Sequence, residues 1–220
     1  MSGNSVNVFL TEFEDGIFGY DVQITAEDAT VGDYLTALEN FQVRTLANCK
    51  GCDGCCHERA PLTLADFYYS EYYQKGGRKI TAWLAETADL QFFGAAADLT
   101  LQRTADGACH LLDTTHKCCA KHQFRTFTCR SHCCLPKSER AEALRAAIIN
   151  AGEDELLRRL LAELTETGAA DFLPGKKRLA GVNAADYAAN GFSSLPGEQW
   201  REAKLSELVD TALWQELQTD

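Results

Sequence analysis

Two stretches near the N-terminus are rich in β-branched and aromatic residues, and a turn-forming sequence separates them. The stretches are residues 6–13 and 17–25, and the turn is Glu14-Asp15-Gly16. This pattern predicts a β-hairpin. A helix is expected next, because Thr30 and Asp33 have the spacing of a capping box. Apolar residues then recur at helical spacing, at Val31, Tyr34, Leu35, Leu38 and Phe41.

Shorter elements are expected in the middle of the chain. Thr63 and Asp66 repeat the capping-box spacing, and the aromatic face that follows predicts one helix that runs through Tyr73 and ends at Gly76-Gly77. A further helix is expected over the apolar residues Ile80, Trp83 and Leu84.

Two cysteine-bearing segments follow these helices. Residues 99–112 predict a second hairpin that turns at Ala105-Asp106-Gly107, so that its returning strand carries Cys109. Residues 118–134 contain five cysteines and one pair of large apolar residues, Phe124 and Phe127. Such a segment has little material for a regular amphipathic element, and it predicts loop and short helix around a site.

The C-terminal third has regular helical stripes and contains neither cysteine nor histidine after residue 136. One stripe covers residues 144–148, a second covers 156–164, and a third covers 200–217. Gly152 and Gly168 are the expected helix ends.

Together these elements predict an α+β fold that is mainly helical. We expect an N-terminal hairpin and helix over residues 1–44 and a cysteine-rich, metal-binding core enclosed by helices over 45–136. A helical C-terminal region over 137–220 completes the chain, and the three segments are expected to pack as one globular unit.

Composition and charge restrict the possible functions. The 220 residues are 45% hydrophobic, which is enough for a core without disulfides. The N-terminus has no signal-peptide pattern and no apolar run approaches the ~20 residues of a membrane span, so we expect a soluble, cytoplasmic protein without membrane association. A net charge of -11 argues against binding nucleic acid. In a reducing cytoplasm, ten cysteines indicate metal ligands or redox groups.

The first cysteine segment, CKGCDGCCH, contains two C-x2-C steps in series through Cys49, Cys52 and Cys55. Three thiolates at these intervals match the opening of the bacterial ferredoxin run, in which they bind irons of one cubane. Gly51 and Gly54 suit this interpretation, because they permit a tight turn. Cys56 and six later cysteines supply further thiols: Cys109, Cys118, Cys119, Cys129, Cys133 and Cys134.

These motifs resemble the CxxCxxCC, or YkgJ-type, cysteine cluster family, whose members are described as zinc- or iron-chelating proteins. The resemblance covers residues 45–136. It rests on Cys49-x2-Cys52-x2-Cys55-Cys56, Leu62-Thr63-x2-Asp66, Cys109-x-Leu-Leu and Cys119-x5-Arg125-x3-Cys129-Arg130. It implies metal ligation by Cys49, Cys52, Cys55, Cys56, Cys109, Cys119, Cys129 and Cys134. Cys118 and Cys133 are possible additional ligands.

The leading hypothesis is one or two [4Fe-4S] clusters, because three thiols in one loop suit a cubane better than the paired knuckles typical of zinc. Arg125 and Arg130 are expected beside the cluster, where they would offset its negative charge, and His132 is expected to donate a hydrogen bond there.

Three functional classes remain open at this point. The first is a redox or electron-transfer protein with a protein partner. The second is a structural zinc-binding interaction module or metal carrier. The third is a cluster-dependent enzyme, since some flagellin lysine N-methylases resemble the same cysteine family in part. No glycine-rich nucleotide loop is present, and the C-x3-C-x2-C spacing of radical adenosylmethionine enzymes is absent from the sequence.

Overall fold

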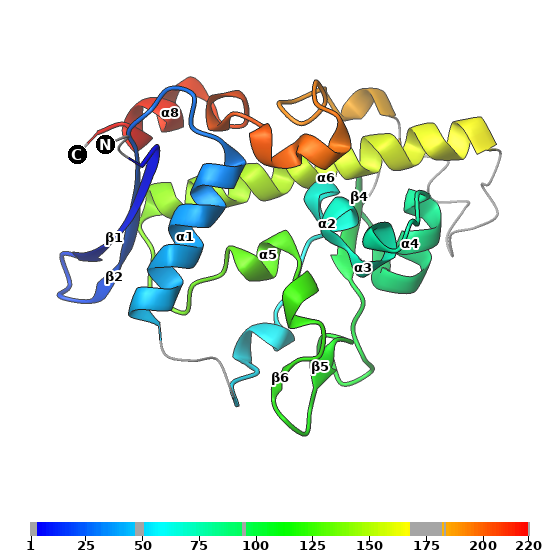
Figure 1. Cartoon of the computed structure of the whole chain (residues 1–220), viewed down its shortest axis with the longest axis horizontal. Helices are drawn as coiled ribbons and strands as arrows, with labels where there is room; N and C mark the ends of the chain where they lie inside the picture. Colours follow the sequence, from blue (N-terminus) through cyan, green and yellow to red (C-terminus); the bar gives the residue numbers. More distant parts are fainter. Residues whose placement is uncertain (1–3, 47–50, 94–95, 168–181, 183, 220) are drawn as a thin grey trace. The chain divides into compact units, whose positions relative to one another are not determined.

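A computed structural model describes residues 4–46, 51–93, 96–167, 182 and 184–219 (Figure 1). The chain forms two compact units. The first unit comprises residues 1–47, 130–151 and 190–220, and the second comprises 48–129 and 152–189. The predicted α+β class with mainly helical content is confirmed. The division of the chain at residues 44 and 136 stays a prediction.

In the first unit the predicted hairpin and helix are both confirmed. Strands β1 (Val6–Glu12) and β2 (Phe18–Ile24) pair antiparallel. Gly16 takes a φ of 78° in their turn, a conformation that glycine adopts without steric cost. The helix α1 (Val31–Thr45) begins with the predicted capping box and buries all five of the expected apolar residues. These residues cover one face of the hairpin with an apolar core.

The predicted helix over 200–217 is wrong, because the chain forms three shorter elements. They are η4 (Gly197–Glu202), η5 (Leu205–Glu207) and α8 (Thr211–Leu217). The amide of Val31 donates to the carbonyl of Ala203 at 2.9 Å, and the amide of Leu205 donates to the carbonyl of Ala29 at 2.9 Å. These contacts with the residues before α1 use peptide groups that a continuous helix would need for itself.

In the second unit the aromatic stretch forms two helices where the sequence predicted one. They are α2 (Leu64–Tyr69) and α3 (Glu71–Gln74), and the expected α4 (Ile80–Thr87) follows them. Ser70 separates the first two with extended backbone at ψ 152°, and its hydroxyl accepts a hydrogen bond from the amide of Tyr73. A serine that caps the next turn therefore ends α2 early.

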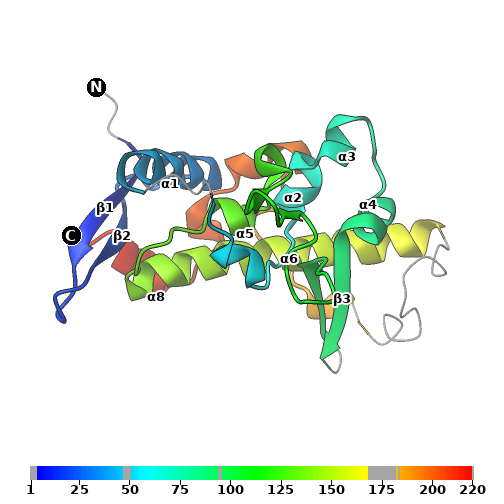
Figure 2. The same ribbon diagram turned by 90° about the horizontal axis from the view of Figure 1, so that it is seen from below.

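The second predicted hairpin is also corrected. Strand β4 (Ala96–Leu101) pairs with the preceding strand β3 (Ala88–Phe93), which the sequence analysis missed (Figure 2). The expected turn at residues 105–107 exists, with Gly107 at φ 83°. The strands on either side of it pair only through one antiparallel bridge, between Arg103 and Cys109. The longer pairing of β4 with β3 therefore determines where the sheet lies.

Short elements carry the later cysteines, as predicted for residues 118–134. They are β6 (Cys118–Cys119), which pairs with β5 (Leu112–Asp113), then η2 (His122–Phe124) and α5 (Phe127–Arg130). A further turn, η3 (Ala184–Asp186), lies near the end of the second unit.

Gly152 does not end a helix, because α6 (Glu139–Thr167) continues through it. The second expected end, Gly168, lies outside the described residues. A Cβ atom added at Gly152 would lie 2.8 Å from the Cβ of Thr63. The glycine therefore permits α6 to approach the N-terminus of α2 more closely than any other residue would.

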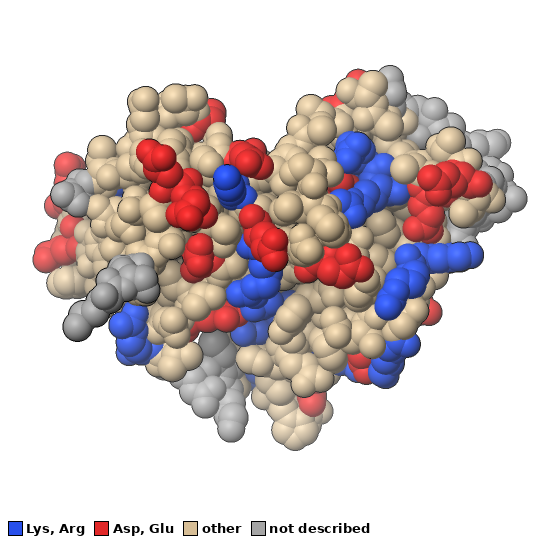
Figure 3. Space-filling model, turned by 45° about the horizontal axis from the view of Figure 1, so that its top comes forward, with Lys and Arg blue, Asp and Glu red and all other residues tan. Residues whose placement is uncertain are grey.

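On the face drawn in Figure 3, acidic side chains lie among the basic ones. Among the described helices, none has the length and apolar character needed to cross a bilayer.

A buried carboxyl group joins α6 to the sheet of the second unit. The Glu153 carboxylate accepts a hydrogen bond from the amide of Leu99 at 2.9 Å. Burial, together with the neighbouring carboxyl of Asp98, raises the pKa of Glu153 from 4.5 to about 8. Asp98 itself forms an ion pair with Arg59. Glu153 is therefore protonated in the folded protein at neutral pH.

Replacing Glu153 by Gln should change how stability depends on pH. Between pH 4.5 and 8 the folded wild type holds a proton that the unfolded chain releases, so its free energy of unfolding decreases as pH rises through this window. Glu153→Gln lacks this term and should gain about 1–3 kcal/mol relative to wild type between pH 5 and pH 8.5. Urea titrations at both pH values measure the difference. The exposed Glu166→Gln on the same helix is the control, and parallel curves for Glu153→Gln and wild type would contradict the assignment.

Candidate metal centre

The first cysteine segment forms a short, exposed turn. The turn η1 (Gly54–His57) carries Cys55 and Cys56, and it follows Gly51 at φ 79°. Cys52 and Cys55 are exposed, whereas Cys56 is partly buried. Cys49 lies outside the described residues.

Backbone hydrogen bonds fasten this segment to the hairpin that carries Cys109. The amide of Cys109 donates to the carbonyl of Cys56 at 2.7 Å, and the amide of Leu101 donates to the carbonyl of Ala60 at 2.9 Å. The guanidinium of Arg103 adds a hydrogen bond to the carbonyl of His57 at 2.6 Å. Cys56 and Cys109 are thus held as neighbours by main-chain contacts, which do not depend on a bound metal.

The two adjacent cysteines of the two-residue strand β6 point in different directions. Cys119 pairs with Leu112, and Cys118 pairs with Asp113. Successive side chains of a strand point to opposite faces, so one of the two thiols faces the cavity that Cys56 and Cys109 line and the other faces away from it. Cys119 is the one that lines the pocket.

A single carboxylate connects the start of α2 to the helix that carries Cys129. Asp66 accepts hydrogen bonds from the amide of Thr63 at 2.7 Å and from its hydroxyl at 2.9 Å. It also accepts a hydrogen bond from the amide of Phe127, which begins α5. The hydroxyl of Thr128 adds a bond to the carbonyl of Pro61 at 2.8 Å. These contacts place the helix that carries Cys129 against the start of α2.

Five thiols line one small cavity, which we call the cysteine pocket. It has a volume of about 60 Å³, and its walls include the apolar side chains of Leu101 and Leu111. The thiols come from η1, from the hairpin, from β6 and from α5: Cys55, Cys56, Cys109, Cys119 and Cys129. Segments that lie more than 70 residues apart in the sequence therefore contribute to one site.

Burial raises the pKa values of three thiols that line this cavity. Across the described parts of the chain, His, Cys, Asp and Glu side chains form no group of three or more placed to hold a metal ion. Burial raises the pKa of Cys56 to about 12, with the nearby thiols of Cys55 and Cys109 adding to the effect, and burial raises the pKa of Cys129 to about 11. Burial likewise raises the pKa of Cys109. A metal must therefore displace protons when it binds here.

The half-buried Arg125 places a positive charge in the wall of the cysteine pocket. Its Nε is buried and has no hydrogen-bond partner, and among the described residues no carboxylate pairs with its guanidinium. A buried N–H donor without an acceptor is costly. The donor set of the pocket fits a negatively charged metal–thiolate group, because such a group would give Arg125 the partner it lacks.

Several predicted site residues belong to the first unit. Arg130 donates from its Nε to the Glu39 carboxylate at 3.1 Å. The Gln42 amide donates to the carbonyl of His132 at 2.9 Å and contacts the Cys133 sulfur at 3.6 Å. Cys133 is buried and Cys134 is exposed. The predicted roles of these residues at a metal stay predictions.

The sequence analysis missed the residues that assemble the pocket. Thr63 and Asp66 were expected to form a helix cap, and they do, but the third hydrogen bond of Asp66 had no signal in the sequence because its donor is a backbone amide. Leu101 and Leu111 were expected only as strand residues of the predicted hairpin, and nothing in the sequence indicated that they line a pocket.

No protein-family model matches the chain, and no curated protein or solved structure matches it. The resemblance to the cysteine cluster family therefore stays a prediction from its motifs, and the site has to be argued from its own geometry.

Asp66→Asn should separate the two halves of the cysteine pocket. The amide that replaces one carboxylate oxygen would face backbone donors, so we expect a loss of about 2–4 kcal/mol in the free energy of unfolding. Alkylation of the Cys129 thiol, followed by mass spectrometry, should become faster.

Asp33→Asn is the matched control, because Asp33 forms the same capping box with Thr30 in the first unit but has no third donor among the described residues. We expect it to cost about 1 kcal/mol and to leave Cys129 alkylation unchanged. Equal effects of the two variants would contradict the linking role of Asp66.

Proposed function

We propose that the cysteine pocket binds an iron–sulfur cluster, and that the protein transfers electrons to a protein partner. The observation that carries this proposal is the convergence of five thiols and one unpaired guanidinium on a single cavity. A cubane takes four thiolates, each on a different iron, so its ligands surround a volume. Thiols that line the wall of a cavity from four separate elements suit that requirement.

The ligands that we assign within the second unit are Cys56, Cys109, Cys119 and Cys129. The remaining lining thiol, Cys55, can replace its neighbour Cys56 as the fourth ligand. Of the ferredoxin-like run Cys49, Cys52 and Cys55, the pocket lining includes Cys55, so this spacing favours a cluster over zinc if Cys55 is a ligand in place of Cys56.

The residues around the pocket would then affect the reduction potential of the cluster. The amide of Leu111 lies 3.4 Å from the Cys109 sulfur and donates to it. Hydrogen bonds to ligating sulfur and nearby positive charge both raise the reduction potential of a cluster. Leu101 and Leu111 keep water from the inner side of the pocket, whereas Cys55 is exposed at its outer side. A partner could approach that exposed edge.

Metal analysis with a matched pair of variants tests the proposal. The protein is purified without oxygen, and iron, acid-labile sulfide and zinc are measured per chain with the visible spectrum. We expect about four irons with equal sulfide in wild type. Cys119→Ser should lose the cluster, because its thiol lines the pocket, and Cys118→Ser should retain it.

A colourless protein with zinc and no sulfide would overturn the redox proposal and favour a structural zinc module. Equal iron loss in Cys118→Ser and Cys119→Ser would contradict the assignment of ligands within β6.

Arg125→Met should have opposite effects on the empty and the loaded protein. Without metal, removal of an unpaired buried charge should increase the free energy of unfolding by about 1 kcal/mol. With a cluster, loss of the positive charge should lower the reduction potential measured by protein-film voltammetry.

The control for this substitution is Arg59→Met, whose guanidinium pairs with Asp98 at the surface. It should leave the potential unchanged and alter stability by less than about 1 kcal/mol. A higher potential in Arg125→Met would contradict the proposed role.

A further inference from the structure

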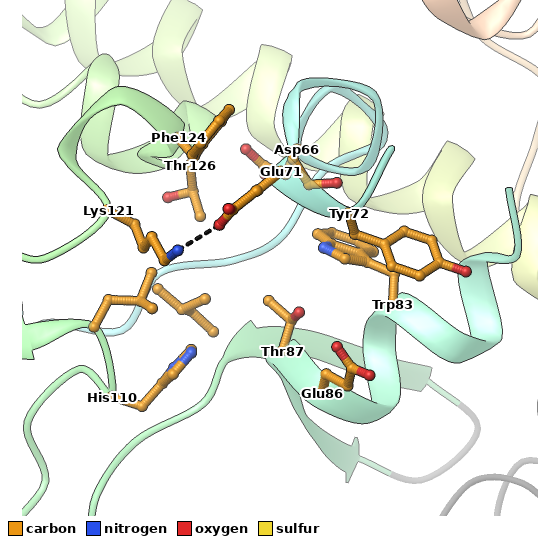
Figure 4. A pocket seen from close by; sticks show the side chains of 13 residues that line it. Asp66, Glu71, Tyr72, Trp83, Glu86, Thr87, His110, Lys121, Phe124 and Thr126 are labelled. Carbon is orange, nitrogen blue, oxygen red and sulfur yellow. Dashed lines mark hydrogen bonds and ion pairs between the residues drawn. The ribbon is translucent and has the colours of Figure 1, made fainter. Parts of the chain in front are cut away.

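A second and larger cavity adjoins the cysteine pocket. Its volume is about 240 Å³, and all of its lining residues belong to the second unit (Figure 4). Three of them also line the cysteine pocket: Leu101, Leu111 and Thr126. We call the larger cavity the amine pocket, for the ligand class argued below.

The charged side chains around the amine pocket are mainly acidic. Its lining contains three carboxyl groups and one ammonium group, those of Asp66, Glu71, Glu86 and Lys121. Lys121 pairs with Glu71, and Lys75, which lies outside the lining, pairs with the same carboxylate at 2.7 Å. Even with both lysines counted, the carboxyl groups outnumber the ammonium groups by three to two. A cavity with this balance of charge attracts cations and repels anions.

Glu86 is the lining carboxylate that is available to a ligand. Glu71 already has two lysine partners, and Asp66 accepts three hydrogen bonds from uncharged donors. Glu86 is exposed, and its carboxylate forms no ion pair or hydrogen bond with the other described residues. In Figure 4, Glu86, Thr87 and His110 lie on one side of the cavity and Glu71 lies on the other.

His110 and Thr87 supply two further acceptors beside Glu86. The main-chain amide and the Nδ1 of His110 both lie 3.0 Å from the carbonyl oxygen of Gln102. A carbonyl oxygen can only accept, so Nδ1 carries the hydrogen and Nε2 of the neutral ring is an acceptor. The ring points into the cavity in Figure 4. The hydroxyl of Thr87 has no hydrogen-bond partner among the described residues.

Much of the remaining wall is apolar. Tyr72, Trp83 and Phe124 contribute aromatic side chains, and Leu101 and Leu111 contribute aliphatic ones. Aromatic rings suit a cation as well as an apolar group, because the face of a ring attracts positive charge. Cavities that hold drug-sized ligands are usually larger than about 300 Å³, so this one suits a smaller molecule.

We propose that the amine pocket binds a small primary amine, in its protonated form, with an apolar body. The ammonium group donates to the Glu86 carboxylate, the Thr87 hydroxyl and the Nε2 of His110, and the body packs against the aromatic and aliphatic wall. A primary ammonium group has three N–H donors, which equals the number of these acceptors. This site goes beyond the proposed function and does not depend on the nature of the metal in the neighbouring pocket.

The positive charge of Lys121 opposes a cationic ligand, but only weakly. Its ammonium group is paired with Glu71, and its side chain is 48% exposed, so solvent screens its charge. Lys121→Gln should therefore strengthen the binding of an amine by about twofold to threefold. An anionic ligand would respond in the opposite direction.

Benzylamine is the probe, and the indole N–H signals of the full-length protein in a ¹H–¹⁵N NMR spectrum are the readout. The chain has three tryptophans, so Trp200 and Trp214 serve as internal references. We expect benzylamine to shift the Trp83 signal alone, with a Kd on the order of 1 mM. Benzoate should bind at least about tenfold more weakly because of its charge. Benzyltrimethylammonium should bind about fivefold more weakly, because it keeps the charge but has no N–H donor.

Glu86→Gln and Glu166→Gln are the matched variants, because each removes one exposed negative charge from the second unit and only Glu86 lines the cavity. Glu86→Gln should weaken benzylamine binding about fivefold, and Glu166→Gln should change it less than about twofold. Thr87→Val, which keeps the shape of the side chain, should weaken it about threefold through loss of the hydroxyl.

Four outcomes would each overturn the proposal. They are stronger binding of benzoate than of benzylamine, an unshifted Trp83 signal, weaker benzylamine binding in Lys121→Gln, and equal losses in Glu86→Gln and Glu166→Gln. Equal affinities for benzylamine and benzyltrimethylammonium would contradict recognition through N–H donors. The metal content of the protein is measured in parallel, so failure of the cluster assignment is seen separately.

Discussion

The carboxylate of Asp66 is the contact on which the cysteine-rich part of the molecule depends. It accepts two hydrogen bonds from Thr63 and one from the amide of Phe127, and it is 6% exposed. Each of these bonds involves a charged acceptor in a buried setting, where such bonds are stronger than in water. One side chain thereby caps α2, which follows the first cysteine segment, and fixes the start of α5, which lies within the second. Gly152 contributes to the same region, because a glycine at this position permits α6 to pack closely against Thr63.

The pocket that results is held together by hydrogen bonds of the protein itself. Burial raises the pKa values of Cys56, Cys109 and Cys129, which favours their neutral thiols, and the buried Nε of Arg125 has no hydrogen-bond partner among the described residues. Thiolates bound to a metal would reverse this situation, because their negative charge would stabilise the guanidinium. Metal binding and stability of the second unit are therefore expected to be linked.

The sequence by itself determined the elements whose signals are local. The capping boxes at Thr30 and Thr63, the turn at Gly16 and the five buried residues of α1 followed from spacing and residue type, because they depend on neighbours a few positions away. It also identified the cysteines as candidate ligands. The tertiary structure decided which of them share a cavity, because Cys56, Cys109, Cys119 and Cys129 meet through backbone hydrogen bonds that any residue type could make. For the same reason the structure alone revealed the pairing of β3 with β4, the passage of α6 through Gly152 and the unpaired Nε of Arg125. Long-range packing and main-chain contacts leave no pattern of residue types in a single sequence.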